Sequence, residues 1–306
     1  MTRKKEREQE IITISPNRRP YGVRLALLLE TSTKFNIQGD CVLLTSQDYI
    51  IRLIPNTTEP DILSLPNHQC WDILVEGFST AGEAEKIGLK VALGLLWGAV
   101  SRQFAAKLLY STPLPCSVYD RTKSKGLMMT GHATIEIGLG ISGIVGPLES
   151  IISSKSPADL KLLIAMELFA SSRLETTARS RFVGMVSSLE PLADQQKYQH
   201  PELDRLISSF KNELSSSTIP SEIANIIKNR IDSLKIESVS GAIRRLVRQL
   251  LPNEPESLEI IDEAYNIRSR ILHDGATDSD LELKGREVEA VIRRIFDEII
   301  KSEYLQ

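Results

Sequence analysis

The sequence predicts a two-domain protein, with an α+β N-terminal domain followed by an all-α C-terminal domain. The chain has 306 residues, of which 42% are hydrophobic, so it can form two cores of ordinary size. Short apolar runs separated by turn residues, a pattern typical of strands, occupy much of the region up to about residue 150. Beyond that point apolar residues recur mainly at intervals of three to four, as they do on helices.

The N-terminal part begins with a charged segment, residues 1–20, which is expected to be a flexible lead-in ending in a turn between Pro16 and Pro20. From residue 80 to 110 the apolar spacing becomes that of an amphipathic helix, which Thr80 and Glu83 begin with a capping box. Residues 21–150 are therefore predicted to be an α+β domain, with a sensing or docking role. Its strand candidates are Tyr21–Glu30, Cys41–Ser46, Tyr49–Ile54, Trp71–Gly77 and His132–Ile137.

The C-terminal part, residues 151–306, consists of helical segments that prolines separate. The first is predicted to begin at an N-cap formed by Ser156 before Pro157 and to end near Leu174. Gly275 is placed to end the helix that contains His273. The other predicted helices are Thr177–Ala193, Pro201–Leu214, Ser221–Leu234, Ser238–Leu251, Ser257–His273 and Asp280–Tyr304.

Charge and composition restrict the kinds of site to expect. The net charge is −3, with 16 basic against 15 acidic residues up to residue 150 and 21 against 25 beyond it, so any contact with nucleic acid needs a local basic patch. Four histidines and three scattered cysteines, Cys41, Cys70 and Cys116, predict free thiols and neither metal nor cofactor. The longest apolar run, Val91–Val100, is half a membrane span, and no secretory signal is evident, so we expect a cytoplasmic protein without a membrane segment.

The strongest functional motif lies at the end of the helix predicted for Ser257–His273. Arg268 and His273 are separated by four residues, and Asp274 and Gly275 follow them. This stretch resembles the R-x(4–6)-H motif of HEPN domains, and the chain looks closest to the Apea-like HEPN family. The resemblance covers roughly residues 155–306, about half of the chain. It includes Arg181-Phe182, the segment Ser188–Leu192 with Glu190, Ser240–Ile243, and the apolar positions Val288, Val291, Ile292 and Ile295.

The resemblance implies a helical bundle of HEPN type that acts as a metal-independent endoribonuclease. Such proteins are homodimers in which the motif of each protomer meets its twin at a shared cleft. Arg268 and His273 match the two catalytic positions, and Glu190 and Arg181 match supporting ones. The family commonly has asparagine or aspartate where this chain has Ser269, which lies four residues before His273 and is predicted to orient its ring. Functionally, the chain is similar to toxins and anti-phage abortive-infection ribonucleases. The alternative is a catalytically inactive HEPN domain that serves as a dimerisation or partner-binding scaffold.

The chemistry of RNA cleavage suits these two residue types. RNA carries its own nucleophile, the 2′-hydroxyl, so the protein needs only to move protons and to stabilise charge on the phosphorus oxygens. A histidine can exchange those protons near neutral pH, and an arginine offers a permanent positive charge. On a helix the five-residue step from Arg268 to His273 is a rotation of about 140° net and a rise of about 7.5 Å. The two side chains therefore do not share a face, which favours a site completed by a second protomer.

Each of these residues also has a structural interpretation. A histidine before Asp274-Gly275 can simply bind a carbonyl or carboxylate group at the end of a helix. Arg244, Arg245 and Arg248 form a basic cluster that, together with Arg270, is a candidate contact for the RNA backbone. The alternative for the cluster is a solvated helix face whose arginines pair with nearby carboxylates.

A glycine pattern, Gly138 to Gly143, formally matches the G-x-G-x-x-G motif of dinucleotide-binding folds. That motif requires a helix immediately after it, because the N-terminus of the helix binds the pyrophosphate. Gly146 and Pro147 predict that no helix forms here. We therefore expect a glycine turn or an interdomain hinge and no nucleotide site.

Overall fold

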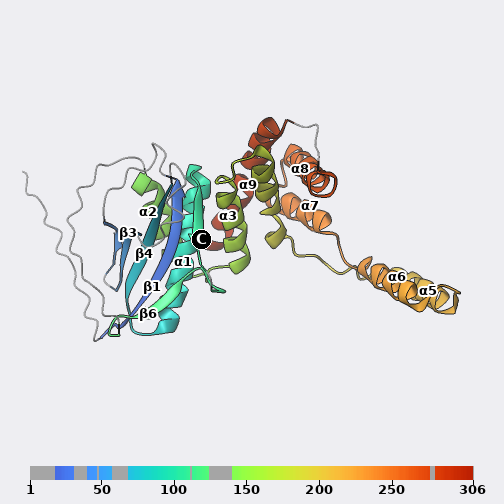
Figure 1. Ribbon diagram of the computed structural model, residues 1–306, viewed down its shortest axis with the longest axis horizontal. Coiled ribbons are helices and arrows are strands. Elements are labelled where there is room, and N and C mark those ends of the chain that lie inside the picture. The colour runs from blue at the N-terminus through green and yellow to red at the C-terminus, as the bar shows by residue number, and fades with distance from the viewer. Residues whose placement is uncertain are drawn as a thin grey trace, which may run out of the picture. The chain divides into compact units, whose positions relative to one another are not determined.

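The computed structural model describes residues 18–30, 40–46, 48–56, 68–110, 112–123, 140–275 and 280–305. The chain divides into two compact units (Figure 1), the first formed by residues 1–177 and 299–306 and the second by residues 178–298. An antiparallel sheet region precedes a helical region, as predicted. The two units divide at Thr177, so the helix predicted for residues 156–174 belongs to the same unit as the sheet.

The first unit contains an antiparallel sheet in which the strand order is β2-β3-β4-β1-β5, with β6 also paired to β1. β5 and β6 pair with different parts of β1, residues 26–29 and residues 21–24 respectively. The first four strand predictions are confirmed to within a few residues, and the predicted strand His132–Ile137 lies outside the described residues. The strands are β1 (Tyr21–Glu30), β2 (Cys41–Thr45), β3 (Ile50–Pro55), β4 (His68–Phe78), β5 (Ala106–Leu109) and β6 (Ser117–Asp120).

One face of the sheet is covered by helix α1 (Ala81–Arg102), which runs along it in Figure 1. Val23, Leu25 and Leu27 of β1 are fully buried at alternate positions, as expected when one sheet face forms the core. Gly88 of α1 lies directly over Val23, because a Cβ atom built on Gly88 would be 2.7 Å from Cγ2 of Val23. The absence of a side chain at Gly88 therefore allows the helix backbone to approach the sheet closely.

Helix α1 is buried nearly all round in its second half, which differs from the single apolar stripe that its spacing predicts. One of the two hydrogen bonds of the predicted capping box is confirmed, since Thr80 Oγ1 accepts a hydrogen bond from the Glu83 backbone N–H at 3.2 Å. The helix lies in contact with the sheet and also with α2 and α3, so it has no face left for solvent along much of its length. Its buried residues include Val91, Ala92, Leu93, Leu95, Leu96, Ala99 and Val100.

The helix predicted to continue to residue 110 ends at Arg102. Gln103 adopts a left-handed conformation, with φ of 59°, and its N–H donates to the carbonyl of Ala99. The chain then enters β5, where Ala106 and Leu108 are buried. Pairing with β1 thus supersedes the local helical spacing, because it buries apolar side chains and satisfies the backbone hydrogen bonds of a sheet edge.

Helix α2 (Gly140–Ser153) corrects the prediction of a glycine turn or hinge. It continues through Pro147, which cannot donate a hydrogen bond to the carbonyl of Gly143. That carbonyl oxygen lies beside α1, 2.9 Å from the position that a Cβ of Gly98 would take. Ile144, Leu148 and Ile151 of α2 are fully buried. The packing of α2 against α1 therefore outweighs the cost of the proline.

Helix α3 (Leu160–Ser172) has Asp159 as its N-cap, which corrects the prediction of Ser156. The Asp159 carboxylate accepts hydrogen bonds from the N–H groups of Lys161, at 2.7 Å, and Leu162, at 3.4 Å. Ser156 instead donates to the Glu303 carbonyl at 2.7 Å. The first unit thus includes the last turns of helix α9, and a hydroxyl that could have capped α3 is used to bind them.

The second unit is entirely helical in its described residues, apart from a bridge between Lys197 and Ile236. α8 packs against α4 and α7, and α5 and α6 pack against each other as a hairpin. The long helix α9 begins in this unit and ends in the first. The elements are α4 (Ala178–Ser187), the 3-10 turn η1 (Glu190–Leu192), α5 (Pro201–Ser216), α6 (Ser221–Ser233), α7 (Val239–Leu250), α8 (Pro255–Asp274) and α9 (Leu281–Tyr304).

Candidate functional site

The predicted motif lies on α8, whose limits follow from its sequence. Pro255 occupies the first turn, where its missing N–H has no helical partner to lose. Gly275 follows the last turn with φ of 72°, and its N–H donates to the Ile271 carbonyl at 3.1 Å. This confirms the predicted helix end. Ser257, Ile261, Ala264, Ile267 and Ile271, at spacings of three and four, form the buried face.

Arg268 is held by three groups of the second unit. Its Nη2 atom lies 2.7 Å from Oε1 of Glu190, and its Nε donates to the Ser187 hydroxyl at 3.2 Å. Its guanidinium also lies over the ring of Tyr265, 5.5 Å from the centroid, which is a favourable cation–π position. The Arg268 side chain is only 18% exposed. The guanidinium is therefore oriented from the η1 turn, the end of α4 and its own helix.

The negative charge of Glu190 affects Tyr265 as well as Arg268. Burial first, and then the Glu190 carboxylate, raise the pKa of the Tyr265 phenol above its usual value, while the Arg268 guanidinium acts in the opposite direction. Tyr265 precedes Arg268 by three residues, so the two side chains share a helix face. Neither Tyr265 nor Ser187 was predicted as a site residue. The three-residue spacing to Arg268 is a signal that could have identified Tyr265, and no local signal points to Ser187.

His273 occupies the last turn of α8 and is exposed. Within the part of the chain that the structure describes, its ring makes no hydrogen bond or ion pair, and the Ser269 hydroxyl, four residues earlier, does not bind it. Arg270 is likewise exposed and, over the same residues, unpaired. The structural interpretation of His273, as a group that binds a carbonyl or carboxylate, is thus not realised among these residues. The ring remains accessible to solvent.

The structure brings Arg268 and Glu190 together but leaves the third predicted supporting residue elsewhere. Arg181, on α4, has its Nη1 atom 3.6 Å from a carboxylate oxygen of Glu282, at the start of α9. Both side chains are well exposed, at 41% and 61%. An exposed pair at this distance contributes little to stability.

Two of the predicted RNA-backbone arginines on α7 are engaged with carboxylates. The Arg244 Nη2 atom lies 2.6 Å from Asp262 of α8, and the Arg245 Nη2 atom lies 3.0 Å from Glu237. A hydrogen bond from Arg245 is the main cause that lowers the pKa of Glu237. Arg248 is exposed. Arg244 and Arg245 thus adopt the alternative arrangement, in which ion pairs join neighbouring segments.

A second polar cluster lies on the sheet face opposite α1, in the first unit. Arg24 and Asp72 form an ion pair of 2.9 Å, and Glu76 accepts a hydrogen bond from Tyr119 at 3.0 Å and faces Arg121 at 3.3 Å. Burial, followed by the charge of Glu76, raises the pKa of the Tyr119 phenol. Most of the polar groups in this cluster are paired with one another. We therefore assign the cluster a structural role, in which it covers this face of the sheet.

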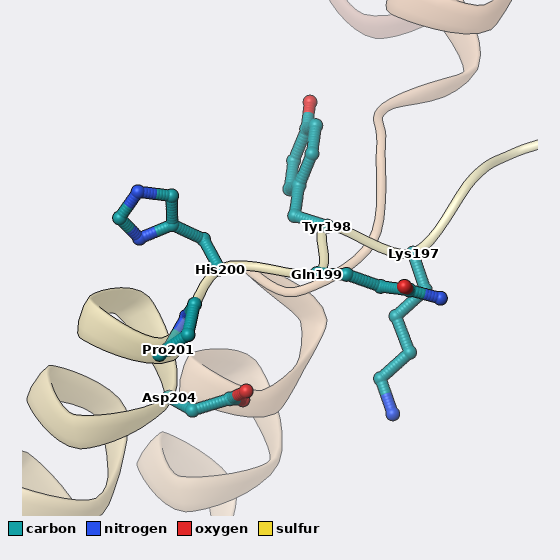
Figure 2. A pocket seen from close by; sticks show the side chains of 6 residues that line it. All are labelled: Lys197, Tyr198, Gln199, His200, Pro201 and Asp204. Carbon is teal, nitrogen blue, oxygen red and sulfur yellow. The ribbon is translucent and has the colours of Figure 1, made fainter.

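A shallow hollow lies at the base of the α5–α6 hairpin (Figure 2), between Lys197 and Asp204. Its Tyr198 and His200 side chains point in different directions, and the Lys197 side chain extends away from both. Hydrogen bonding to Lys235 is the main cause that lowers the pKa of Asp204. The groups do not converge on one point, so the hollow has no arrangement suited to acid–base chemistry.

The described residues contain no group of three or more histidine, cysteine, aspartate or glutamate side chains that could hold a metal ion. Over the same residues, no helix is both long enough and apolar enough to cross a bilayer. Comparison with known proteins identifies no relative, since no family model, curated protein or solved structure matches this chain. The functional conclusion therefore rests on the geometry around Arg268 and on the sequence motif.

Proposed function

We propose that the helical region is a HEPN-type endoribonuclease domain that cleaves RNA without a metal, with Arg268 and His273 as the catalytic residues. The observation that carries the proposal is the contrast between these two side chains on one helix. Arg268 is covered and fixed in orientation by Glu190, Ser187 and Tyr265. His273 is solvent-exposed five residues later. A fixed cation and an accessible imidazole are the two components that the reaction requires.

The Arg268 guanidinium retains a donor for a substrate. Its Nε and Nη2 atoms are used by Ser187 and Glu190, whereas Nη1 contacts no acceptor among the described residues. In the proposed reaction the 2′-oxygen of RNA attacks phosphorus, the bond to the 5′-oxygen breaks, and a 2′,3′-cyclic phosphate and a 5′-hydroxyl result. His273 takes the proton of the 2′-hydroxyl or returns one to the 5′-oxygen, and Nη1 of Arg268 stabilises a non-bridging oxygen.

The proposal includes a homodimer formed by the C-terminal region. Arg268 and His273 point about 140° apart around α8, so the imidazole of one protomer and the guanidinium of the other are better placed to share a phosphate. A toxin or an anti-phage effector is the corresponding biological role, and residues 21–150 would then receive the signal from a regulatory partner or ligand.

The second candidate is a non-catalytic HEPN scaffold, and one specific observation favours it. The Arg294 guanidinium lies 2.7 Å from the Glu254 carboxylate and donates to the Ser257 hydroxyl at 3.2 Å. This is the same combination of arginine, glutamate and serine that surrounds Arg268. The group around Arg294 has no motif histidine, so it is structural. The similar group around Arg268 is consistent with a structural role as well.

The Arg294 group also supplies the matched control for the decisive experiment. The parent protein and the variants Arg268→Ala, His273→Ala, Arg294→Ala and His200→Ala are incubated with mixed RNA in EDTA, and the products are analysed for 2′,3′-cyclic phosphate ends. Loss of about 100-fold or more is expected in the two motif variants, and near-parental cleavage in the two controls. His200 is a suitable control because it is an exposed histidine of the same unit.

Parental protein that does not cleave RNA, or motif variants that cleave as well as the controls, would rule out the nuclease proposal and favour the scaffold. A cellular version measures growth on expression. Toxicity of the parent that His273→Ala relieves and His200→Ala does not relieve supports the toxin role.

A further inference from the structure

The α5–α6 hairpin exposes large apolar side chains that its own packing does not use. Leu203, Ile207 and Leu214 of α5 and Ala224 and Ile231 of α6 are the buried or half-buried positions. Beside them lies a second set of residues, which we call the apolar flank: Leu206, Phe210, Ile223 and Leu234, which are exposed, and Ile227, which is half-buried. Leu206, Phe210, Ile223 and Leu234 are 50%, 55%, 50% and 61% exposed.

The members of the apolar flank lie on the same side of the hairpin. At 100° per residue, Leu206 and Phe210 fall on one side of the buried stripe of α5, and Ile223, Ile227 and Leu234 fall on one side of that of α6. A groove lined by Phe210, Leu214, Ile227 and Ile231, among others, joins the two sides. The groove joins the middle of the flank across both helices, and Leu206, Ile223 and Leu234 extend it along the same side. Apolar residues grouped on one side in this way are typical of an interaction site.

The register of the hairpin sets where each member of the flank lies along the two helices. Ion pairs join Lys211 to Asp232 and Lys235 to Asp204, the latter at 2.6 Å, so α5 and α6 are antiparallel and their levels are set. Leu206 and Leu234 then lie at one end of the flank and Ile223 at the other. Phe210 and Ile227 lie on either side of its middle, about one helical turn apart along the axis.

Two charged residues of opposite sign, Arg230 and Glu213, lie beside the flank. Arg230 of α6 lies about level with Phe210, and Glu213 of α5 lies about level with Ile227. Among the described residues neither Arg230 nor Glu213 has an ion-pair partner. A two-fold axis that runs roughly along the helices, through the middle of the flank, would place α6 of each copy against α5 of the other. Arg230 of each copy would then lie opposite the Glu213 side chain of the other copy, and the apolar residues would face one another.

We propose that the α5–α6 hairpin pairs with the same hairpin of a second copy of this chain, flank against flank, as an antiparallel four-helix bundle. The charge balance selects this occupant. Residues 201–233 contain four basic and five acidic residues, a net charge of −1. The hairpin therefore has no net electrostatic attraction for RNA or anionic lipid. A symmetric pairing of this kind buries the apolar flank of each copy and forms two Arg230–Glu213 ion pairs, one on each side of the axis. It does so whether or not the chain cleaves RNA.

The first test measures the mass of the full chain by sedimentation equilibrium over a range of concentrations. The parent is expected to be a dimer, and Phe210→Glu is expected to raise the dissociation constant by about tenfold or more, because a carboxylate enters the centre of the interface. Asn212→Glu is the matched control, since it adds the same charge on the opposite side of α5 and is expected to leave the mass unchanged. Circular dichroism confirms that the variants remain helical.

The second test examines the symmetry. Glu213→Arg and Arg230→Glu each place like charges opposite each other and are expected to weaken the dimer, whereas the double variant restores the pairs and the parental dissociation constant. A monomeric parent, a Phe210→Glu chain as dimeric as the parent, or charge swaps that fail to compensate would each overturn the proposal. A monomeric parent would also contradict the homodimer of the nuclease proposal. The Phe210→Glu and charge-swap outcomes concern the hairpin alone, because they are read as mass and do not depend on RNA cleavage.

Discussion

The guanidinium of Arg268 lies 2.7 Å from the carboxylate of Glu190, a residue 78 positions earlier in the chain. The pair is more covered than most of the ion pairs of the second unit, with side-chain exposures of 18% and 33%. Whether Arg268 is catalytic or structural, this contact joins α8 to the η1 turn. It is therefore expected to contribute to stability as well as to orientation.

Glu190→Gln is predicted to lower the free energy of unfolding by about 1 kcal/mol, because it leaves a largely covered guanidinium without its counter-charge. Glu282→Gln is the control. It removes a carboxylate of the same kind from the exposed pair with Arg181 and is expected to cost less than about 0.3 kcal/mol. Urea unfolding of both variants measures the difference, and equal losses would contradict the structural role assigned to Glu190.

Gly98→Ala is predicted to destabilise the first unit by about 1–3 kcal/mol, since the new Cβ would lie 2.9 Å from the backbone oxygen of Gly143. A backbone oxygen inside a packed helix cannot move aside without shifting α2. Gly146→Ala, on the exposed side of α2, meets nothing within 4 Å. It is expected to stabilise by about 0.5 kcal/mol through helix propensity. Thermal unfolding of the two variants should shift in opposite directions.

Tyr304→Phe is predicted to destabilise the first unit by about 1–2 kcal/mol. The Tyr304 hydroxyl donates to the Pro157 carbonyl at 3.0 Å and accepts from the Asp159 N–H at 2.9 Å, so it joins the end of α9 to the start of α3. Tyr198→Phe removes a hydroxyl from a half-exposed side chain and is expected to have no effect on stability. Comparable unfolding midpoints for the two variants would show that the Tyr304 hydroxyl is not needed.

Alkaline pH is predicted to destabilise the protein partly through Cys116. Burial, and secondly the charge of Glu85, raise the pKa of the Cys116 thiol from 9.0 to about 11. Because the folded-state pKa is the higher one, the contribution is fully present below pH 9 and is lost as the pH rises through about 11. Cys116→Ala should therefore lose less stability than the parent between these pH values. The native thiol should also resist alkylation below pH 9, and full reactivity without denaturant would contradict its burial.

Local patterns predicted most helices of the second unit well, although the helix predicted for Thr177–Ala193 ends at Ser187 and a separate 3-10 turn follows it. Pro255 and Gly275 mark the ends of α8, and Ser238 caps α7 by accepting from the Gly241 N–H at 3.1 Å. These signals act within one helical turn, so they can be read from neighbouring residues. The four longer strands of the sheet were predictable for the same reason, because turn residues and β-branched runs alternate along the chain.

The errors occurred where distant segments determine local structure. β5 and β6 are four residues each, too short to be recognised without the edge of β1 with which they pair. The helix through Pro147 requires the glycine face of α1, and the choice of Asp159 over Ser156 as a cap depends on the end of α9. In each case a nonlocal contact outweighs a local preference of about 1–3 kcal/mol.

By itself, the sequence determined the order of sheet and helices, the limits of most helices, and the motif that places Arg268 and His273 five residues apart on one helix. Only the tertiary structure decided that Glu190 and Ser187 orient Arg268, that Arg244 and Arg245 are engaged in ion pairs, and that the last turns of α9 belong to the first unit. The physical reason is the range of the interactions. Helix caps and periodicity depend on neighbouring residues, whereas ion pairs and close helix packing join residues whose proximity no local pattern records.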